Sequence, residues 1–344
     1  MSRHEELSSV ARELVATGKG ILAADESSGT IKKRFDAIAL ESTEESRRAY
    51  RELLFTAPGI EAFISGVILY DETLRQRASD GRPFARVLRE RGILPGIKVD
   101  LGAKPLPFAP GETVTEGLDG LRQRCAEYRE LGAAFTKWRA VIDIDEANGL
   151  PSDLAIEANA HALARYAALA VEEGLVPIVE PEVLMDGAHS LATCERATER
   201  TLRRVFAALY EHRVPLEAIL LKPNMVVPGK KHAQQSAPPA VAEATLRCFE
   251  RCVPAAVPGI VFLSGGQSEE EATANLDAMN RLGPLPWELS FSYGRALQAS
   301  ALAAWKGDPA NVEAGQRSFL HRARLNGAAR SGRYEPKMEK KIAV

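Results

Sequence analysis

The chain has 344 residues, with 44 lysines and arginines against 46 aspartates and glutamates, and a formal net charge of −2. This near balance gives no reason to expect nucleic-acid binding, and no apolar run approaches the roughly 20 residues that span a bilayer, so no membrane partner is expected. Residues 1–18 lack the apolar core of a secretory signal, which predicts residence in the cytoplasm.

Short apolar segments alternate with longer amphipathic segments along the chain. The apolar segments are rich in Ile, Val, Leu or Phe and too short for a typical buried helix. Continuous apolar runs of this kind are typical of parallel strands that are covered on both faces. The predicted strands are Gly20–Asp25, Ile64–Asp71, Ile93–Asp100, Ala134–Ile142, Leu175–Glu182, Ala218–Val226, Gly259–Gly266 and Leu289–Gly294.

Helical patterns lie between these strands. Asp153–Glu173 has apolar residues at helical spacing and is followed by Gly174, a typical helix stop. Leu191–His212 shows the same pattern, and Ala237–Cys252 opens with a pair of prolines that suits a first helical turn.

This alternation predicts an α/β fold, a single-domain TIM (β/α)₈ barrel over residues 1–326. An open, doubly wound sheet is the competing architecture. The barrel is favoured because it gathers every strand end around one mouth, whereas an open sheet binds its ligand at one switch point. Polar residues end nearly every predicted strand, namely Asp25, Asp71, Lys98, Lys137, Glu180, Lys222, Ser264 and Tyr293.

No interdomain linker or internal repeat interrupts the pattern, and no Gly-x-Gly-x-x-Gly motif follows the first strand. The segments Pro105–Gly111 and Pro228–Pro239 are predicted to be long loops over the mouth. Residues 327–344 are polar and rich in lysine, and we expect them to form a mobile C-terminal tail.

Lysines inside apolar strands are the most informative feature. Lys98, Lys137 and Lys222 converge with Glu180 and Glu182 on the predicted mouth, although a lysine at a strand end can also extend to the surface. A lysine amine attacks a carbonyl only when it is unprotonated, and desolvation and a neighbouring cation both depress a lysine pKa. The pattern therefore indicates imine catalysis.

Lys222 follows a run of apolar residues, so it is predicted to be the better desolvated amine, with Lys137 supplying the nearby positive charge. Glu180 and Glu182 are two apart on an extended strand and so point into the same compartment. Paired carboxylates suit the proton transfers of imine formation. A purely structural Glu–Lys network is the alternative, because such networks also perturb pKa values.

Two regions are predicted to bind phosphate. The first follows the seventh and eighth strands, where glycines let backbone N–H groups approach an anion. It comprises Ser264, Gly265, Gly266, Tyr293, Gly294 and Arg295. The second is the segment Thr30–Arg34 after the first strand, with Lys98 and Arg139 placed across the mouth.

A metal site is not expected. Cys248 and Cys252 are four apart on a predicted helix, but no histidine or second cysteine pair lies at a supporting spacing. With Cys125 and Cys194, they are interpreted as reduced and mostly buried thiols. No cofactor is predicted either.

Seven segments resemble, in order, those of class I fructose-bisphosphate aldolases, and the resemblance extends from about Gly18 to Lys306. The matching segments are Gly20–Gly29, Gly96–Asp100, Lys137–Arg139, Val176–Leu184, Leu220–Met225, Phe262–Glu271 and Phe291–Ser300.

The resemblance implies the catalytic roles. Lys222 corresponds to the lysine that forms the imine, Glu180 to the acid/base group and Lys137 to a second lysine that tunes the site. Asp25 corresponds to the carboxylate that takes the C4 hydroxyl proton, and Glu182 to a supporting carboxylate.

The resemblance also implies the phosphate sites. Ser264, Gly265, Gly266 and Arg295 resemble the C1-phosphate site, whereas Arg34, Lys98 and Arg139 resemble the region around the C6 phosphate. Thr30 stands where many members have serine. The implied reaction is the reversible cleavage of fructose 1,6-bisphosphate in glycolysis and gluconeogenesis, by a homotetramer and without a cofactor.

One departure concerns the C-terminus. Animal and plant members commonly end in a tyrosine that assists proton transfer to the enamine, but this chain ends with residues Lys340–Val344. The nearest tyrosine is Tyr334, so Tyr334 or another group is expected to take that role.

Other functions remain open at this point. Another imine-forming barrel aldolase, similar to transaldolase, would use the same lysine. A metal-dependent aldolase would need clustered histidines, but the histidines are scattered and none ends a predicted strand. A non-catalytic scaffold on the same fold would not need Lys222, Glu180 and Asp25.

Overall fold

The computed structural model describes residues 2–340, in which the predicted closed barrel is confirmed. Each barrel strand is hydrogen-bonded to the barrel strand that precedes it along the chain, and the last strand pairs in parallel with the first and closes the barrel. The barrel strands are β1 (Gly20–Ala24), β2 (Ile64–Leu69), β3 (Leu94–Lys98), β6 (Phe135–Ile142), β7 (Val176–Val183), β8 (Leu220–Leu221), β9 (Gly259–Phe262) and β10 (Glu288–Tyr293).

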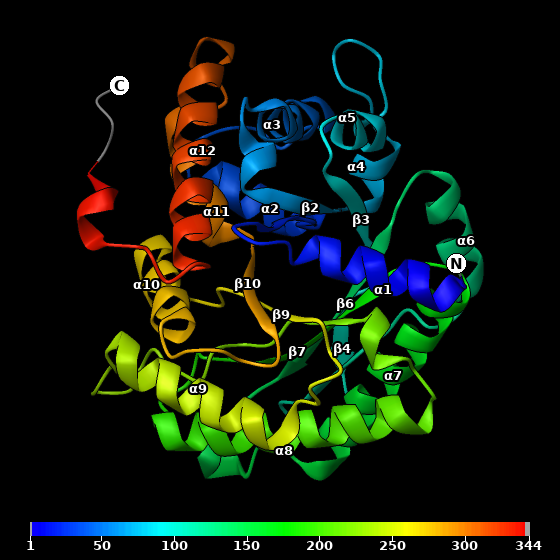
Figure 1. Cartoon of the computed structure of the whole chain (residues 1–344), viewed down its shortest axis with the longest axis vertical. Coiled ribbons are helices and arrows are strands. Elements are labelled where there is room, and N and C mark those ends of the chain that lie inside the picture. The colour runs from blue at the N-terminus through cyan, green and yellow to red at the C-terminus, as the bar shows by residue number, and fades with distance from the viewer. Residues whose placement is uncertain (1, 341–344) are drawn as a thin grey trace.

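Helices surround the barrel (Figure 1) and cover the outward faces of its strands. The three helices predicted in detail are confirmed to within one residue at each end. The helices are α1 (Arg3–Leu14), α2 (Ser28–Asp36), α3 (Glu44–Thr56), α4 (Asp71–Arg75), α5 (Phe84–Glu90), α6 (Leu121–Glu130), α7 (Asp153–Glu172), α8 (Leu191–Glu211), α9 (Pro238–Cys252), α10 (Glu269–Asn280), α11 (Arg295–Trp305) and α12 (Val312–Ala329).

A short antiparallel hairpin, β4 (Ala103–Pro105) and β5 (Thr113–Thr115), stands outside the barrel. The predicted loop Pro105–Gly111 connects its strands. The hairpin is fixed to β6 because the hydroxyl of Thr115 donates to the Arg139 carbonyl at 2.7 Å.

Helix α1 closes the N-terminal end of the barrel, and Figure 1 looks onto this end with α1 in front of the strands. Leu14 and Val15 pack against the inward side chains at the bottoms of the strands. Glycines allow this close approach, because a Cβ at Gly66 would lie 2.7 Å from Leu14 Cδ2 and one at Gly259 would lie 2.5 Å from Val15 Cγ1. Any ligand must therefore enter from the opposite end.

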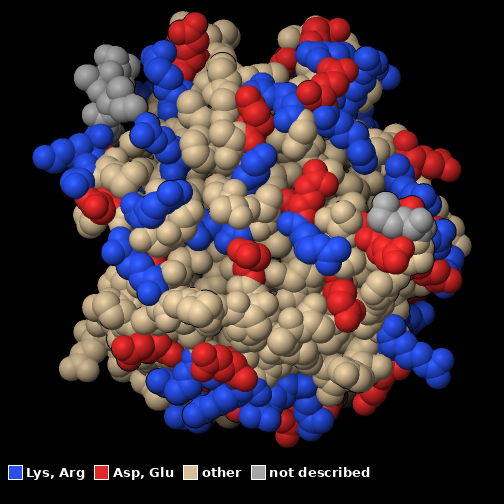
Figure 2. Space-filling model, viewed as in Figure 1, with Lys and Arg blue, Asp and Glu red and all other residues tan. Residues whose placement is uncertain are grey.

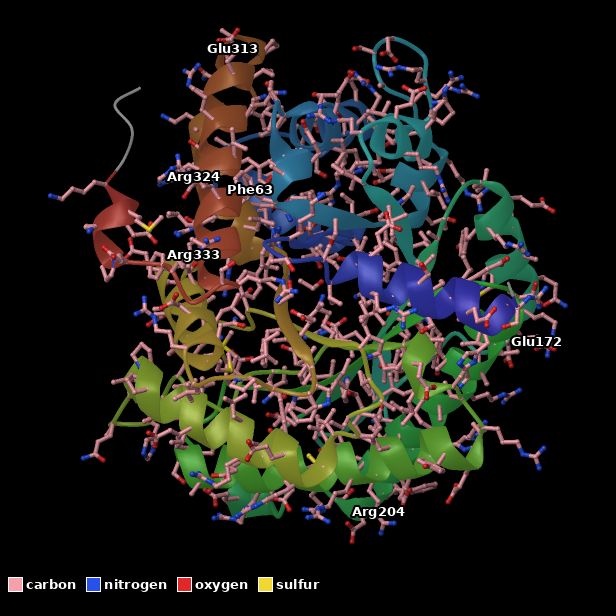
Figure 3. All side chains as sticks on the ribbon, viewed as in Figure 1. Phe63, Glu172, Arg204, Glu313, Arg324 and Arg333 are labelled. Carbon is pink, nitrogen blue, oxygen red and sulfur yellow. The ribbon has the colours of Figure 1, made fainter. Side chains whose placement is uncertain are left out.

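The predicted boundary after residue 326 is wrong, because α12 continues to Ala329. Gly327 does not end the helix but lets it pack closely: a Cβ there would lie 2.8 Å from the Gly18 carbonyl oxygen and 2.9 Å from Phe63. Figure 3 shows Phe63 beside α12. Arg330 follows, is buried, and donates to the carbonyl of Leu289 at 2.8 Å.

The rest of the predicted tail is packed as far as Lys340. Tyr334 is buried; its backbone N–H donates to Asp277 at 2.8 Å, and its hydroxyl donates to Glu339 at 2.8 Å. Arg322 on α12 also pairs with Glu339 at 2.5 Å. Specific contacts thus hold the segment that the sequence predicted to be mobile, while residues 341–344 lie outside the described part of the chain.

Acidic and basic side chains are interspersed over the face shown in Figure 2, as the small net charge suggests. Between residues 2 and 340, no helix combines the length and apolar character that crossing a membrane requires.

Candidate active site

A cavity of about 820 Å³ opens at the C-terminal ends of the strands. Its lining includes residues at or just beyond the ends of all the barrel strands, which is where a barrel of this type places its ligands. The predicted site residues, with the exception of Tyr293, contribute to the lining. They are Asp25, Thr30, Arg34, Lys98, Lys137, Arg139, Glu180, Glu182, Lys222, Ser264, Gly265, Gly266, Gly294 and Arg295.

A buried chain of alternating charges lies at the centre of the cavity. Lys137 Nζ is 2.7 Å from Asp25 Oδ2 and 3.1 Å from Glu180 Oε2. The other oxygen of Glu180, Oε1, is 3.2 Å from Lys222 Nζ. Strand alternation aims these side chains inward, and the two lysines and Glu180 are each 4% exposed in their side chains. Lys222 therefore does not extend to the surface.

The charges of this cluster stabilise one another. Burial by itself raises the pKa of Asp25 and of Glu180, but Lys137 and Lys222 outweigh burial and hold both pKa values below their ordinary range. Burial lowers the pKa of Lys137, yet Asp25 and Glu180 more than compensate and raise it above its usual value. Lys137 is consequently a cation, and both carboxylates are ionised.

A second group of charges lies beside this cluster. Arg139 Nε is 2.5 Å from Glu182 Oε2, which gives the predicted supporting carboxylate a direct cationic partner. Lys98 donates to the backbone carbonyl of Asp100 at 2.8 Å, and the Asp100 carboxylate accepts from the Arg139 backbone N–H at 3.1 Å. Asp100 was not assigned a site role from the sequence, although it ends the predicted third strand.

Glu26 is a further site residue that the sequence analysis missed. Its carboxylate accepts from Arg34 and, at 2.6 Å, from Arg51 on α3. Burial raises the pKa of Glu26, but Arg51 and Arg34 lower it below its ordinary value. The pairing orients the Arg34 guanidinium at the rim of the cavity.

The turn Ser264–Gly266, which the sequence predicted to bind phosphate, lies in the cavity wall. Gly265 has a φ of 56°, which favours glycine. The N–H of Gly266 points at Met185 Sδ, 3.0 Å away, and sulfur is a weak acceptor. Arg295 lies beside the turn and donates to the Gly265 carbonyl at 3.2 Å. The Gly266 N–H and the Arg295 guanidinium thus lie at the same part of the cavity wall.

Tyr293 was wrongly predicted to be a site residue. It is fully buried on the outer side of β10, where its hydroxyl donates to the Ala272 carbonyl of α10 at 2.9 Å. The preceding residue, Ser292, lines the cavity instead. The sequence contained this signal, because Leu289, Phe291 and Tyr293 share one face of the strand and the serines share the other.

Within the described residues, no three His, Cys, Asp or Glu side chains converge as ligands for a metal ion. The cysteines carry free thiols, and all but Cys252 are buried. Cys252 is partly exposed and bonds within its own helix, to the Cys248 carbonyl at 2.9 Å.

The family model for class I fructose-bisphosphate aldolase matches residues 6–344. The chain belongs to the class I fructose-bisphosphate aldolases. Members of this family are carbon–carbon lyases of glycolysis, which agrees with the prediction from the matching segments.

Curated relatives match this aldolase over nearly its whole length. A probable class 1 fructose-bisphosphate aldolase of Xanthomonas campestris pv. campestris is 56% identical over 332 residues, which cover 96% of this chain and 99% of the relative. The fructose-bisphosphate aldolase of Dictyostelium discoideum is also 56% identical, with 96% and 93% covered.

A solved structure of fructose-bisphosphate aldolase from Plasmodium falciparum, in complex with TRAP and a small-molecule inhibitor, superimposes with a TM-score of 0.96. Its sequence is 52% identical, and the match covers 97% of this chain and 96% of that one. The comparison agrees with the barrel described above.

Tyr334, which the sequence offered for the role of the family's C-terminal tyrosine, lies away from the cavity in this arrangement. Tyr334 is absent from the cavity lining and is held by Asp277 and Glu339. Of the two options left open by the sequence, a group other than Tyr334 is therefore favoured.

Proposed function

We propose that this aldolase cleaves fructose 1,6-bisphosphate reversibly, through an imine on Lys222, into dihydroxyacetone phosphate and glyceraldehyde 3-phosphate. The observation that carries the proposal is the buried contact of Lys222 with Glu180, at 3.2 Å, inside the cavity. The site thus places an amine and a proton carrier side by side and away from bulk water.

The first half of the reaction is imine formation. The neutral amine of Lys222 attacks C2 of the ketose, and the resulting carbinolamine loses water as Glu180 relays a proton to the departing hydroxyl. Lys137 stays protonated beside this amine, because Asp25 and Glu180 raise its pKa above the usual value. The supporting role of Glu182 rests on its pairing with Arg139.

The second half is carbon–carbon cleavage. Asp25 is ionised and accepts the proton of the C4 hydroxyl, the C3–C4 bond breaks, and its electrons move to the protonated imine. Glyceraldehyde 3-phosphate leaves and an enamine remains on Lys222. Protonation of the enamine and addition of water then release dihydroxyacetone phosphate and regenerate the amine.

The two phosphate groups of the substrate fit the two cationic ends of the cavity. We assign the C1 phosphate to the Ser264–Gly266 turn, Gly294 and Arg295. We assign the C6 phosphate to the side that carries Thr30, Arg34, Lys98 and Arg139.

Trapping with borohydride tests the nucleophile. Incubation of the protein with dihydroxyacetone phosphate and borohydride is expected to add one covalent adduct, which peptide mapping places on Lys222. Lys222→Met is expected to lose both the adduct and the cleavage activity, whereas the exposed control Lys104→Met keeps both. An adduct on another lysine, or cleavage by Lys222→Met, would refute the assignment.

The rival functions give different results in a substrate panel. A transaldolase-like enzyme would transfer a three-carbon unit from an unphosphorylated C1 end, and a scaffold would turn over none of the substrates. We also propose that this aldolase works in the cytoplasm as a homotetramer, on the basis of family resemblance alone. Light scattering of the purified full chain tests the tetramer.

A further inference from the structure

Lys230 lies in the cavity wall but belongs to none of the elements assigned so far. It comes from the long loop that follows β8 and that the sequence predicted to lie over the mouth. Its ammonium lies directly over the Ser264–Gly266 turn: a Cβ added at Gly266 would be 1.9 Å from Lys230 Nζ. Gly266 therefore leaves the space that Lys230 occupies.

The backbone around Lys230 is firmly placed. Its own N–H donates to the Met185 carbonyl at 2.7 Å, and the N–H of Gly229 donates to the His189 carbonyl at 2.8 Å. Gly229 allows this contact, because a Cβ there would lie 2.1 Å from the Gly187 carbonyl oxygen. The loop is thus fixed to the segment after β7, and only the side chain of Lys230 is left to adjust.

The partner of Lys230 can be exchanged easily. Its Nζ pairs with Asp186 at 2.8 Å, but the two side chains are 40% and 63% exposed. Exposed pairs of this kind contribute little to stability, whereas a hydrogen bond between an ammonium and a phosphate is among the strong ones. The cations at the other end of the cavity differ, because Arg34, Lys98 and Arg139 pair with carboxylates that are nearly buried.

We infer that Lys230 binds the C1 phosphate of the substrate together with the Ser264–Gly266 turn and Arg295, and that it is a specificity determinant for substrates phosphorylated at C1. The inference rests on the proposed function for the identity of the ligand. In the reverse reaction, the same phosphate belongs to dihydroxyacetone phosphate, so Lys230 acts on that substrate and not on glyceraldehyde 3-phosphate.

Steady-state kinetics of the full-length Lys230→Met variant test the inference. Loss of one charge-assisted hydrogen bond raises KM for fructose 1,6-bisphosphate and for dihydroxyacetone phosphate about tenfold. We expect kcat to change less than about twofold and KM for glyceraldehyde 3-phosphate to stay constant. Lys230→Arg is expected to restore most of the affinity, and Lys231→Met, a change at the exposed neighbour, is the matched control.

Two outcomes overturn the inference. An unchanged or lower KM for dihydroxyacetone phosphate would mean that Lys230 covers the turn without binding the phosphate. An equal rise in KM for both triose phosphates would mean that Lys230 does not distinguish the C1 phosphate from the C6 phosphate. Borohydride trapping with unphosphorylated dihydroxyacetone separates this failure from that of the proposed function. The trap requires the imine but no phosphate contact, so Lys230→Met should trap as wild type does, whereas no trapping in either protein would refute the imine itself.

Discussion

Replacing Lys137 by methionine removes the cation between two buried carboxylates while keeping the length of the side chain. In the wild-type protein, Lys137 Nζ lies 2.7 Å from Asp25 and 3.1 Å from Glu180. The variant would leave these carboxylates with Lys222 as the nearest amine, and the free energy of unfolding should fall because a buried charge has lost its partner.

The magnitude follows from these distances. At an effective dielectric constant of about 20, the two attractions amount to about 6 and about 5 kcal/mol. The variant does not carry the desolvation cost of a buried ammonium, which is several kcal/mol. The difference agrees with the loss of about 3–5 kcal/mol that is usual when one partner of a buried pair is removed.

Urea unfolding at pH 7 and pH 5, at one fixed protein concentration, measures this loss. In the wild type, Asp25 and Glu180 have lowered pKa values, so their stabilising contribution is complete above the unfolded-state values near 4 and is lost only as pH falls through the folded-state values. Between pH 7 and pH 5 this contribution is constant. In Lys137→Met, we expect burial to dominate and to raise the pKa values of both carboxyls. At pH 5 these carboxyls are then partly protonated, and the variant is less destabilised than at pH 7.

The difference in stability between wild type and Lys137→Met should therefore be smaller at pH 5 than at pH 7. The matched control is Lys32→Met, which removes a lysine that pairs with Asp36 at a similar 2.8 Å but is 62% exposed. Its expected cost is at most about 1 kcal/mol at either pH. A loss below about 1 kcal/mol for Lys137→Met at pH 7, or a larger gap at pH 5, would refute the electrostatic account of the cluster.

Further changes address single contacts. Asp25→Asn should lower the cleavage rate by about 10²–10⁴ while borohydride trapping with dihydroxyacetone phosphate persists; equal loss of both steps would contradict the role of Asp25 as the base for the C4 hydroxyl. Tyr334→Phe removes the 2.8 Å bond to Glu339 and should cost about 1 kcal/mol in urea unfolding with kcat unchanged, whereas a fall in kcat without a loss of stability would place Tyr334 in the reaction. Gly229→Ala introduces a Cβ 2.1 Å from the Gly187 carbonyl oxygen and should raise KM for dihydroxyacetone phosphate, because Lys230 is displaced; an unchanged KM would show that the loop position is not needed.

The barrel could be predicted from the sequence because each strand is a short apolar run that ends in a polar residue. Strands of a parallel barrel are buried on both faces, so the runs are visible even where β8 is reduced to Leu220–Leu221 in the structure. The tail was less predictable. Gly327 is a typical helix stop in isolation, and only the packed structure shows that it lets α12 lie against Gly18 and Phe63.

The centre of the site was predictable for a similar reason: Lys137, Glu180 and Lys222 are charged residues within apolar strands. Residues whose role depends on distant segments were not. Arg51 lies on α3 amid other charged residues, and nothing in its local sequence indicates that it reaches Glu26. Lys230 lies in an irregular loop, where neither periodicity nor apolar context reveals the direction of a side chain.

The packing of α12 has a consequence for how the chain matures during synthesis. Arg330 joins the end of α1 to β10 by donating to the carbonyls of Val15 and Leu289. Arg330 thus adds a tie between the residue that follows α1 and the strand that pairs with β1. During synthesis this tie cannot form before residue 330 has left the ribosome, and chains truncated before that residue should be cleaved by proteases faster than the full chain.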